Sequence, residues 1–338
     1  MGSRMRIVVV CLFLMGFVSA RAEPPAVFWP TPNGEYFETG DIIDSLQPTV
    51  SGRWESALYG CVRNDGNRFH EGLDLKPIGR DRHNEPTDPI YAVMDGRIVC
   101  INRIAGNSSY GRYIVIEHET LDVPVYTLYA HLAAIDPSVD TGTFVKGGTR
   151  IGTMGRSASY SIPRVRAHLH FEIGVRKSNR FQDYYDFKKY GGKNRFGNYN
   201  GINLTGMDPM LFFEQARTGQ LVDMRSLIQS QPVAYTLRVA TRQVPDYIAR
   251  YPKLLTKHIP AQGLSGWEID FTAEGMPIRW TPLTVDEVTT RREGDITLVK
   301  YYPDVLKGNC RKTITMKGDT PTLGSDLRND LQLIFGFR

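Results

Sequence analysis

The sequence predicts a mainly β protein in which an antiparallel-sheet domain is followed by a smaller α+β domain. Short alternating runs of apolar and polar residues, separated by glycine turns, fill residues 48–209 and favour antiparallel strands. From residue 210 the pattern changes, because helical periodicities appear at residues 211–220, at 243–255 and near the C-terminus. A chain of 338 residues is also more often built as two domains than around one core.

Residues 1–22 predict a secretory signal peptide. Arg4 and Arg6 precede an apolar run over residues 7–18, and Ala20-Arg21-Ala22 fits an Ala-x-Ala cleavage site. The run is too short to span a bilayer, and no later stretch is apolar enough, so we expect no transmembrane segment in the mature chain. The sequence therefore predicts secretion across the cytoplasmic membrane to a periplasmic or extracellular location.

The charge of the mature chain gives no reason to expect nucleic acid as a partner. Cleavage removes Arg4, Arg6 and Arg21 and lowers the formal charge from +5 to +2. Residues 23–47 then form an N-terminal arm, which could cover a groove or serve as a structural arm. Of the three remaining cysteines we expect Cys61 to pair with Cys100, because both belong to residues 48–209, and Cys310 to stay single.

Four of the seven histidines occur in three short motifs that follow one another along the chain. The motifs are His70-Glu71-Gly72-Leu73-Asp74, Tyr129-Ala130-His131 and His168-Leu169-His170. A catalytic zinc site needs three imidazole or carboxylate ligands, with a fourth position open for water. Each motif alone is a weak signal, but together they indicate such a site.

Strand-like patterns around the motifs would bring these side chains together. In residues 165–173 alternate side chains share one face of a strand, so His168, His170 and Glu172 point to the same side. We expect His131 at the end of another strand, and Gly72 would permit a bend that lets the first motif reach one ion. No His-Glu-x-x-His motif occurs, which excludes a thermolysin-like site.

The region over residues 48–209 resembles the lysostaphin/LytM-type zinc endopeptidases, which cut peptide bridges of bacterial peptidoglycan. Besides the three motifs, the resemblance includes residues 88–99, 110–118, 145–155 and 167–173. It covers nearly half of the chain. An insertion over residues 176–203 departs from the family pattern near the expected groove, and residues 210–338 resemble no family that we recognise.

The resemblance implies Zn2+ as the cofactor, with His70, Asp74 and His170 as metal ligands and His131 and His168 as the catalytic pair. Which histidine of the pair is the base stays open at this point. Glu172 could orient a histidine or be a solvated carboxylate. The implied activity is that of a secreted zinc metalloendopeptidase, which hydrolyses peptide bonds in peptidoglycan cross-links or stem peptides by a zinc-activated water.

Two other functions are compatible with the sequence. A LytM-like domain without activity could regulate other cell-wall hydrolases, but such regulators commonly lack metal ligands that this chain retains. A zinc protease acting on ordinary proteins would use the same chemistry. The oligomeric state cannot be predicted from the sequence.

The role of residues 210–338 also stays open between a structural domain that packs on the catalytic one and a wall-binding or partner-binding module. Four aromatic residues could stack on sugars, although aromatic residues in strands usually belong to the core: Trp267, Trp280, Tyr301 and Tyr302. We expect a hairpin over residues 267–280 and a final helix that is capped by Ser325. Its apolar face would comprise Leu327, Leu331, Ile334 and Phe335.

Overall fold

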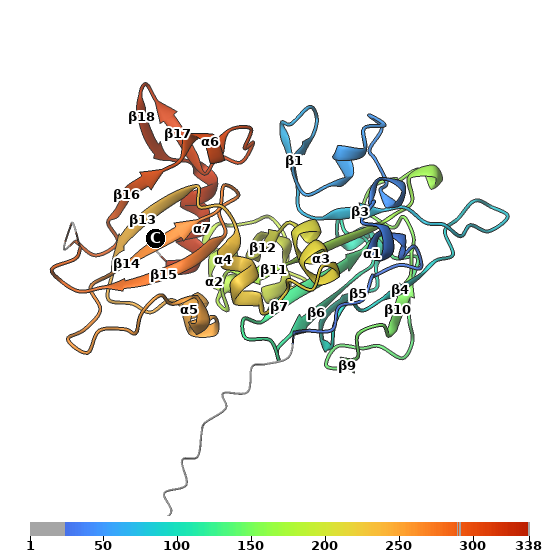
Figure 1. Ribbon diagram of the computed structural model, residues 1–338, viewed down its shortest axis with the longest axis horizontal. Helices are drawn as coiled ribbons and strands as arrows, with labels where there is room; N and C mark the ends of the chain where they lie inside the picture. The colour runs from blue at the N-terminus through green and yellow to red at the C-terminus, as the bar shows by residue number, and fades with distance from the viewer. Residues whose placement is uncertain (1–23, 289, 291, 337–338) are drawn as a thin grey trace, which may run out of the picture.

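The computed structural model of this chain describes residues 24–288, 290 and 292–336. Two antiparallel sheets lie side by side, a seven-stranded sheet built from residues 73–207 and a four-stranded sheet from the C-terminal region (Figure 1). This arrangement confirms the expected mainly β fold class. The predicted signal peptide, residues 1–22, lies outside the described residues. Among the helices that are described, none is long and apolar enough to cross a membrane.

The seven-stranded sheet has the order β12-β11-β7-β6-β5-β9, and β3 pairs with β11. Its strands are β3 Leu73–Leu75, β5 Gly96–Asn102, β6 Tyr113–His118, β7 Val125–Ala130, β9 Phe144–Val145, β11 Leu169–Arg176 and β12 Leu204–Met207. Strand β7 is buried at every position, which shows that both faces of the sheet are covered at its centre. Smaller sheets flank it: the hairpin of β1 Gly60–Arg63 and β2 Arg68–His70, and a three-stranded sheet of β4 Pro89–Tyr91, β10 Arg150–Thr153 and β8 Ala134–Ile135.

The N-terminal arm packs on the seven-stranded sheet through aromatic side chains. It carries the short helix α1 Glu35–Thr39 and runs past α3 Pro209–Arg217. The rings of Trp29 and Phe213 lie 4.7 Å apart, and Phe213 in turn contacts Phe171 of β11 at 5.3 Å. Because the arm contributes buried aromatic residues to the core, we interpret it as a structural arm rather than a cover over a groove.

The C-terminal region is built on the four-stranded sheet of order β15-β14-β13-β16. Its strands are β13 Tyr235–Ala240, β14 Gly266–Phe271, β15 Pro277–Leu283 and β16 Ile296–Tyr301, and β17 Ile314–Lys317 pairs with β18 Thr320–Leu323. The helices of this part are α4 Met224–Ser230, α5 Asp246–Arg250, α6 Pro303–Leu306 and α7 Ser325–Phe335, whereas α2 Phe181–Phe187 belongs to the inserted segment.

The expected elements of the C-terminal region are present with shifted ends. The hairpin over residues 267–280 is confirmed as β14 and β15. The helix expected at residues 243–255 is shorter, because Pro252 begins a separate 3-10 turn after α5. The cap assignment is wrong: Gly324 is the N-cap of α7 and Ser325 is its first residue. The expected apolar face of α7 is buried as predicted.

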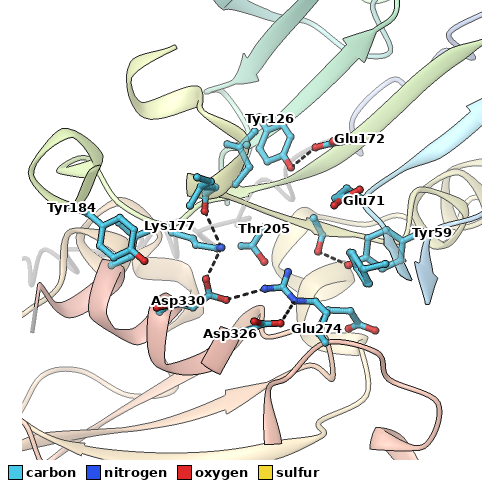
Figure 2. A pocket seen from close by; sticks show the side chains of 18 of the residues that line it. Tyr59, Glu71, Tyr126, Glu172, Lys177, Tyr184, Thr205, Glu274, Asp326 and Asp330 are labelled. Atoms are coloured by element: carbon cyan, nitrogen blue, oxygen red, sulfur yellow. Dashed lines mark hydrogen bonds and ion pairs between the residues drawn. The ribbon is translucent and has the colours of Figure 1, made fainter. Parts of the chain in front are cut away.

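Both sheets contribute to one continuous hydrophobic core, which includes Phe171 and Phe213 as well as Trp267 and Trp280. The two tryptophans are fully buried, so they are core residues and are not available to stack on sugars. Between the sheets, Lys177, directly after β11, forms an ion pair with Asp330 of α7 at 2.6 Å (Figure 2). The C-terminal region is therefore packed tightly against the N-terminal one. The division into two domains at residues 209/210 remains a proposal.

The expected disulfide is wrong, because the structure pairs Cys61 with Cys310. Cys61 lies on β1, and its Cα atom is 5.6 Å from that of Cys310. Cys100 lies on β5 in the seven-stranded sheet, whereas Cys61 and Cys310 meet at the β1–β2 hairpin. Within the described residues Cys100 keeps a free thiol, and burial raises its pKa to about 11.

We expect the variant Cys310→Ser to lower the free energy of unfolding by about 2–5 kcal/mol. The disulfide joins positions 249 residues apart, so its loss frees a long loop in the unfolded chain. Denaturant unfolding without a reducing agent measures the effect, and Cys100→Ser is the control, with an expected loss below about 1 kcal/mol. Equal stability of Cys310→Ser and the native chain would contradict this assignment.

Candidate metal centre

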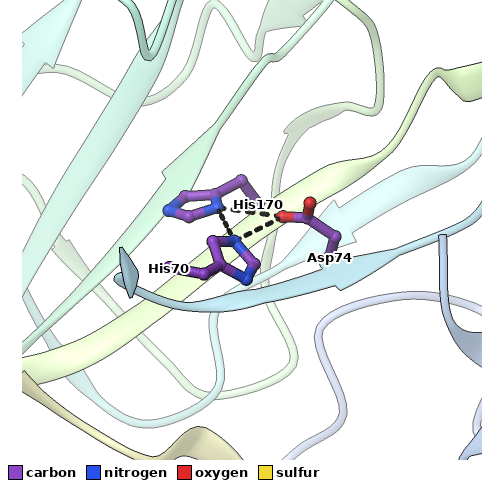
Figure 3. Close-up of side chains that lie close together, drawn as sticks. All are labelled: His70, Asp74 and His170. Atoms are coloured by element: carbon purple, nitrogen blue, oxygen red, sulfur yellow. Dashed lines mark hydrogen bonds and ion pairs between the residues drawn. The ribbon is translucent and has the colours of Figure 1, made fainter. Parts of the chain in front are cut away.

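Three strands bring the first and third histidine motifs together. His70 is the last residue of β2, Asp74 is the middle residue of β3, and His170 is the second residue of β11. In the pairing of β3 with β11, Asp74 lies directly opposite His170, so both side chains point to the same face. Figure 3 shows that the three side chains converge.

Gly72 permits this convergence for a different reason from the one expected. A Cβ atom at this position would lie 2.2 Å from the carbonyl oxygen of Phe171, which is far inside contact distance. The glycine therefore lets the chain between His70 and Asp74 approach the backbone of β11 closely. Any side chain here would push the first motif away from His170.

The geometry of the three side chains fits a metal ion. His70 Nε2 lies 3.1 Å from Asp74 Oδ1 and 3.1 Å from His170 Nδ1, and His170 Nδ1 lies 2.9 Å from Asp74 Oδ1. Ligand atoms at 2.0–2.1 Å from a tetrahedral zinc ion would be about 3.3 Å apart. All three residues are buried, with exposed fractions of 0%, 2% and 5% for His70, Asp74 and His170.

Hydrogen bonds on the outer side of each imidazole direct a lone pair into the cluster. His70 Nδ1 donates to the carbonyl oxygen of Leu58 at 2.6 Å, and His170 Nε2 donates to Glu172 Oε1 at 3.0 Å. When both rings are neutral, the opposite ring nitrogens face the Asp74 carboxylate as acceptors. Three acceptor atoms about 3 Å apart repel one another unless a positive charge lies between them. These three ligand atoms thus suit a cation.

Arg63, which the sequence analysis did not identify, also interacts with the cluster. Its guanidinium donates to His70 Nε2 at 2.8 Å and to the Asp74 carboxylate. Burial opposes a charge on His170, but the hydrogen bonds from its ring to Asp74 and Glu172 outweigh this effect and raise its pKa to about 9. A metal ion would have to replace both charges, so its binding would release a proton.

The other two histidines of the motifs lie beside the cluster. The ring centroids of His131 and His168 are 4.7 Å apart, and His168 Nε2 lies 3.6 Å from Asp74 Oδ2. His131 follows the last residue of β7, as expected, and has a φ of 61°. The predicted strand at residues 165–173 begins only at Leu169, because residues 164–166 form a 3-10 turn, so His168 directly precedes β11.

Both of these histidines present an unprotonated nitrogen at neutral pH. His131 Nδ1 donates to the carbonyl oxygen of Ser157 at 2.8 Å, and His168 Nδ1 donates to that of Arg166 at 2.7 Å. Burial lowers the pKa of both groups, and the neighbouring histidines lower that of His131 further. Each Nε2 atom is therefore able to accept a proton or, once protonated, to donate a hydrogen bond.

Glu172 is a buried partner of His170 and not a solvated carboxylate. Only 2% of its surface is exposed. Besides the bond from His170, it accepts hydrogen bonds from the hydroxyls of Tyr110 at 2.6 Å and Tyr126 at 3.1 Å. These bonds hold the carboxylate in place, and the carboxylate holds the His170 ring in one orientation and tautomer.

A groove opens on one side of the cluster, with a volume of about 530 Å3. Its lining includes Arg63, His131 and His170, together with Tyr110 and Ile202 from neighbouring segments. The three remaining histidines lie elsewhere: His118 is fully buried between Asp95 and Thr127, to which its ring is hydrogen-bonded, and His83 and His258 are in exposed loops. Within the described residues, the only group of at least three candidate ligands close enough to hold a metal is His70, Asp74 and His170.

Residues 68–183 match the sequence model of Peptidase family M23. This stretch contains all five histidine and aspartate residues of the site and most of the seven-stranded sheet. Residues 68–183 thus match an M23 peptidase domain, in agreement with the resemblance to the lysostaphin/LytM type. Among curated protein sequences there is no match.

Solved structures of similar proteins include a zinc-containing peptidase from Vibrio cholerae, at 21% identity over 56% of this chain and 40% of that chain, with a TM-score of 0.32. Lysostaphin from Staphylococcus simulans is 20% identical over 63% of this chain and 75% of its own, with a TM-score of 0.31. Helicobacter pylori Csd3 is 20% identical over 46% of this chain and 32% of its own, with a TM-score of 0.27. This chain thus spans 40% of the Vibrio cholerae protein. Such scores support no functional argument.

Proposed function

We propose that this protein is a secreted zinc metalloendopeptidase that hydrolyses peptide bonds in peptidoglycan cross-links or stem peptides. The observation that carries the proposal is the buried set of three acceptor atoms on His70, Asp74 and His170, which lie about as far apart as the ligands of one zinc ion. These residues would be the metal ligands, and the M23 domain supports a peptidase as the reaction class.

A zinc ion held there would lower the pKa of a bound water to about 7 and polarise the carbonyl of the scissile bond. His131 and His168 would act beside it through their Nε2 atoms. One of them would take the proton of the attacking water and pass it to the leaving amine, and the other would donate a hydrogen bond to the developing oxyanion. Glu172 would orient His170 throughout, because its carboxylate is fixed by two tyrosine hydroxyls.

Peptidoglycan peptides are the proposed substrate because the M23 match and the motif resemblance both point to enzymes of the cell wall. The signal-like residues 1–22 support a location outside the cytoplasmic membrane. The alternative of a silent regulator is less well supported, since all five site residues are present. An ordinary protease remains the second candidate function, because the M23 match points to a peptidase and the chemistry of the site is indifferent to the origin of the peptide.

Digestion assays separate these functions. The zinc-loaded chain would be incubated with purified peptidoglycan and, in parallel, with a panel of folded and unfolded proteins, and the fragment masses would be recorded. We expect muropeptide fragments with new peptide termini and no cleavage of the proteins. Cleavage of the proteins alone would support the ordinary protease, and cleavage of neither substrate would support the regulator.

We expect Glu172→Gln to weaken zinc binding by about 10–100-fold. An amide can accept only through one oxygen and carries no charge, so it orients the His170 ring poorly and makes it a weaker ligand. Competition titration with a chromogenic chelator measures the affinity. The matched control is Glu117→Gln, since Glu117 also accepts a tyrosine hydroxyl, that of Tyr199 at 2.8 Å, but does not contact the cluster. Equal zinc affinity in the two variants would contradict the role of Glu172.

A further inference from the structure

The hairpin of β1 and β2 ends in a candidate metal ligand but has little packing of its own. The two strands form a separate two-stranded sheet beside the seven-stranded one. Within these strands, which the structure describes completely, only His70 is buried. A two-stranded hairpin of this kind is marginally stable by itself. The position of His70 therefore depends on what ties the hairpin to the rest of the molecule.

Two tethers join the hairpin to the C-terminal region, and both start from one pair of facing residues. Cys61 of β1 lies opposite Phe69 of β2. Cys61 forms the disulfide with Cys310, and Cζ of the neighbouring Arg311 lies 5.6 Å from the ring centroid of Phe69. His70 belongs to the next pair along the hairpin. The tethers thus act one residue away from the metal ligand.

The segment around Cys310 is a firm anchor for these tethers. The side-chain amide of Asn309 donates to the carbonyl oxygen of Ala273, in the turn between β14 and β15, at 2.6 Å. On the other side of Cys310, Arg311 lies 3.5 Å from the carboxylate of Asp330 of α7. The anchor is therefore fixed to both the four-stranded sheet and α7, so the disulfide transmits their rigidity to the hairpin.

Close packing does not replace the tethers, because a cavity of about 250 Å3 lies beside them. Tyr59 and Phe69 line it on the side of the hairpin, and Glu274 and Arg311 line it on the side of the C-terminal region, while Glu172 connects it to the metal centre (Figure 2). The start of the hairpin has its own support, since the Tyr59 hydroxyl donates to the carbonyl oxygen of Gly206 at 2.9 Å. Without the tethers, the hairpin would be held at its start alone.

The other two candidate ligands do not depend on the hairpin. Asp74 and His170 face each other across β3 and β11 of the seven-stranded sheet. The sheet thus fixes two of the three acceptor atoms, and the hairpin fixes the third. The observed affinity for a metal falls in proportion to the fraction of chains in which all three atoms are in place. A loosened hairpin would therefore weaken the metal centre without unfolding the sheet.

We propose that the Cys61–Cys310 disulfide is a redox latch, which positions His70 so that the metal centre has its full zinc affinity only when the two cysteines are oxidised. Both cysteines are partly exposed, so a reductant can reach them from solvent. A dithiol would supply two electrons and two protons: the S–S bond breaks, both cysteines become thiols, and the dithiol closes to a cyclic disulfide. The proposal rests on the proposed function, because it takes the cluster to be a zinc centre.

The zinc affinity of the full chain in its two oxidation states tests the latch. The chain would be reduced with dithiothreitol, separated from it, and titrated with zinc against a chromogenic chelator in the absence of oxygen. We expect the reduced chain to bind zinc about tenfold more weakly than the oxidised chain, because the support at Tyr59 remains. Reoxidation with oxidised glutathione should restore the affinity.

Hydrogen exchange of the zinc-free chain is a second readout, which shows whether the change is local. Reduction should accelerate exchange of the backbone amides in residues 58–72 and leave β7 and β11 as protected as in the oxidised chain. Loss of protection throughout the seven-stranded sheet would overturn the latch, since the disulfide would then support the whole fold.

Variants separate the disulfide from other effects of reduction. Cys61→Ala/Cys310→Ala has no thiol at either position that could bind zinc itself, and it should match the reduced chain. Cys100→Ala is the control and should keep the affinity of the oxidised chain, because Cys100 is outside the disulfide. Equal zinc affinity in the oxidised and reduced chains would overturn the latch alone. No zinc binding by the oxidised chain would refute the proposed function together with it.

Discussion

Replacing His70, Asp74 or His170 by alanine is expected to remove stoichiometric zinc and peptidase activity together. Each residue contributes one of three acceptor atoms that lie about 3 Å from one another, and each loss leaves only two protein ligands. Metal affinity should fall so far that less than about a tenth of the chains retain zinc after dialysis against a weak chelator. Elemental analysis per mole of chain measures this directly.

The control for these variants is His83→Ala, which removes a histidine from an exposed loop and should leave zinc and activity unchanged. Circular dichroism and thermal unfolding would show that each variant is folded. Full zinc content in any two of the three ligand variants would refute the assignment, whatever their activity.

His131→Ala and His168→Ala are expected to keep most of the zinc and to lose activity by roughly 10²–10³-fold each. Both rings lie beside the cluster without contributing one of the three converging atoms. Turnover of a soluble stem peptide and zinc content, measured on the same samples, separate catalysis from metal binding.

A normal rate in either variant would remove that histidine from the mechanism. Loss of zinc in His168→Ala would instead make His168 a metal ligand. The pH profile of the surviving activity adds a distinction: the variant that lacks the base should lose the acidic limb of the profile, whereas loss of the oxyanion donor should lower the rate at every pH.

Local patterns predicted that the histidine motifs could converge, and the family resemblance implied which of their side chains form the cluster. Alternation on β11 places His170 and Glu172 on one face, and the antiparallel pairing with β3 puts Asp74 opposite His170. The position of His131 follows from the end of the apolar strand β7. The alternation along each strand depends on residues a few positions apart, and hydrophobic periodicity records it, whereas the pairing of β3 with β11 joins distant segments.

The features that the sequence reasoning missed depend on contacts between distant segments. The Cys61–Cys310 disulfide joins positions 249 residues apart, and composition within residues 48–209 gave no sign of it. Arg63 reaches the cluster because the β1–β2 hairpin folds over it, and only its place on the hairpin that ends at His70 could have indicated this. The cavity beside Glu172 needs the wall around α7, so no single motif could have predicted it.

The structure also bears on the role of the C-terminal region, residues 210–338. A module that only delivers the enzyme to the wall would need no place beside the groove, yet Glu274, Arg311 and Asp330 line a cavity that shares four of its lining residues with the groove. Because both sheets share one core, removal of residues 210–338 would take away Phe213 and expose Trp29 and Phe171, which pack on it. Substitutions in the cavity therefore give a cleaner test of its role than truncation does.

The most direct test of the central claim is digestion of purified peptidoglycan by the zinc-loaded chain in water enriched in oxygen-18, followed by mass spectrometry of the soluble products. If the site hydrolyses a peptide bond, each product pair will contain one new amine and one new carboxyl group that carries a single oxygen-18 atom, and the sugar chains will gain no label. His131→Ala should release these products roughly 10²–10³-fold more slowly. Label on a sugar reducing end, or no soluble products from a chain with full zinc content, would contradict the account.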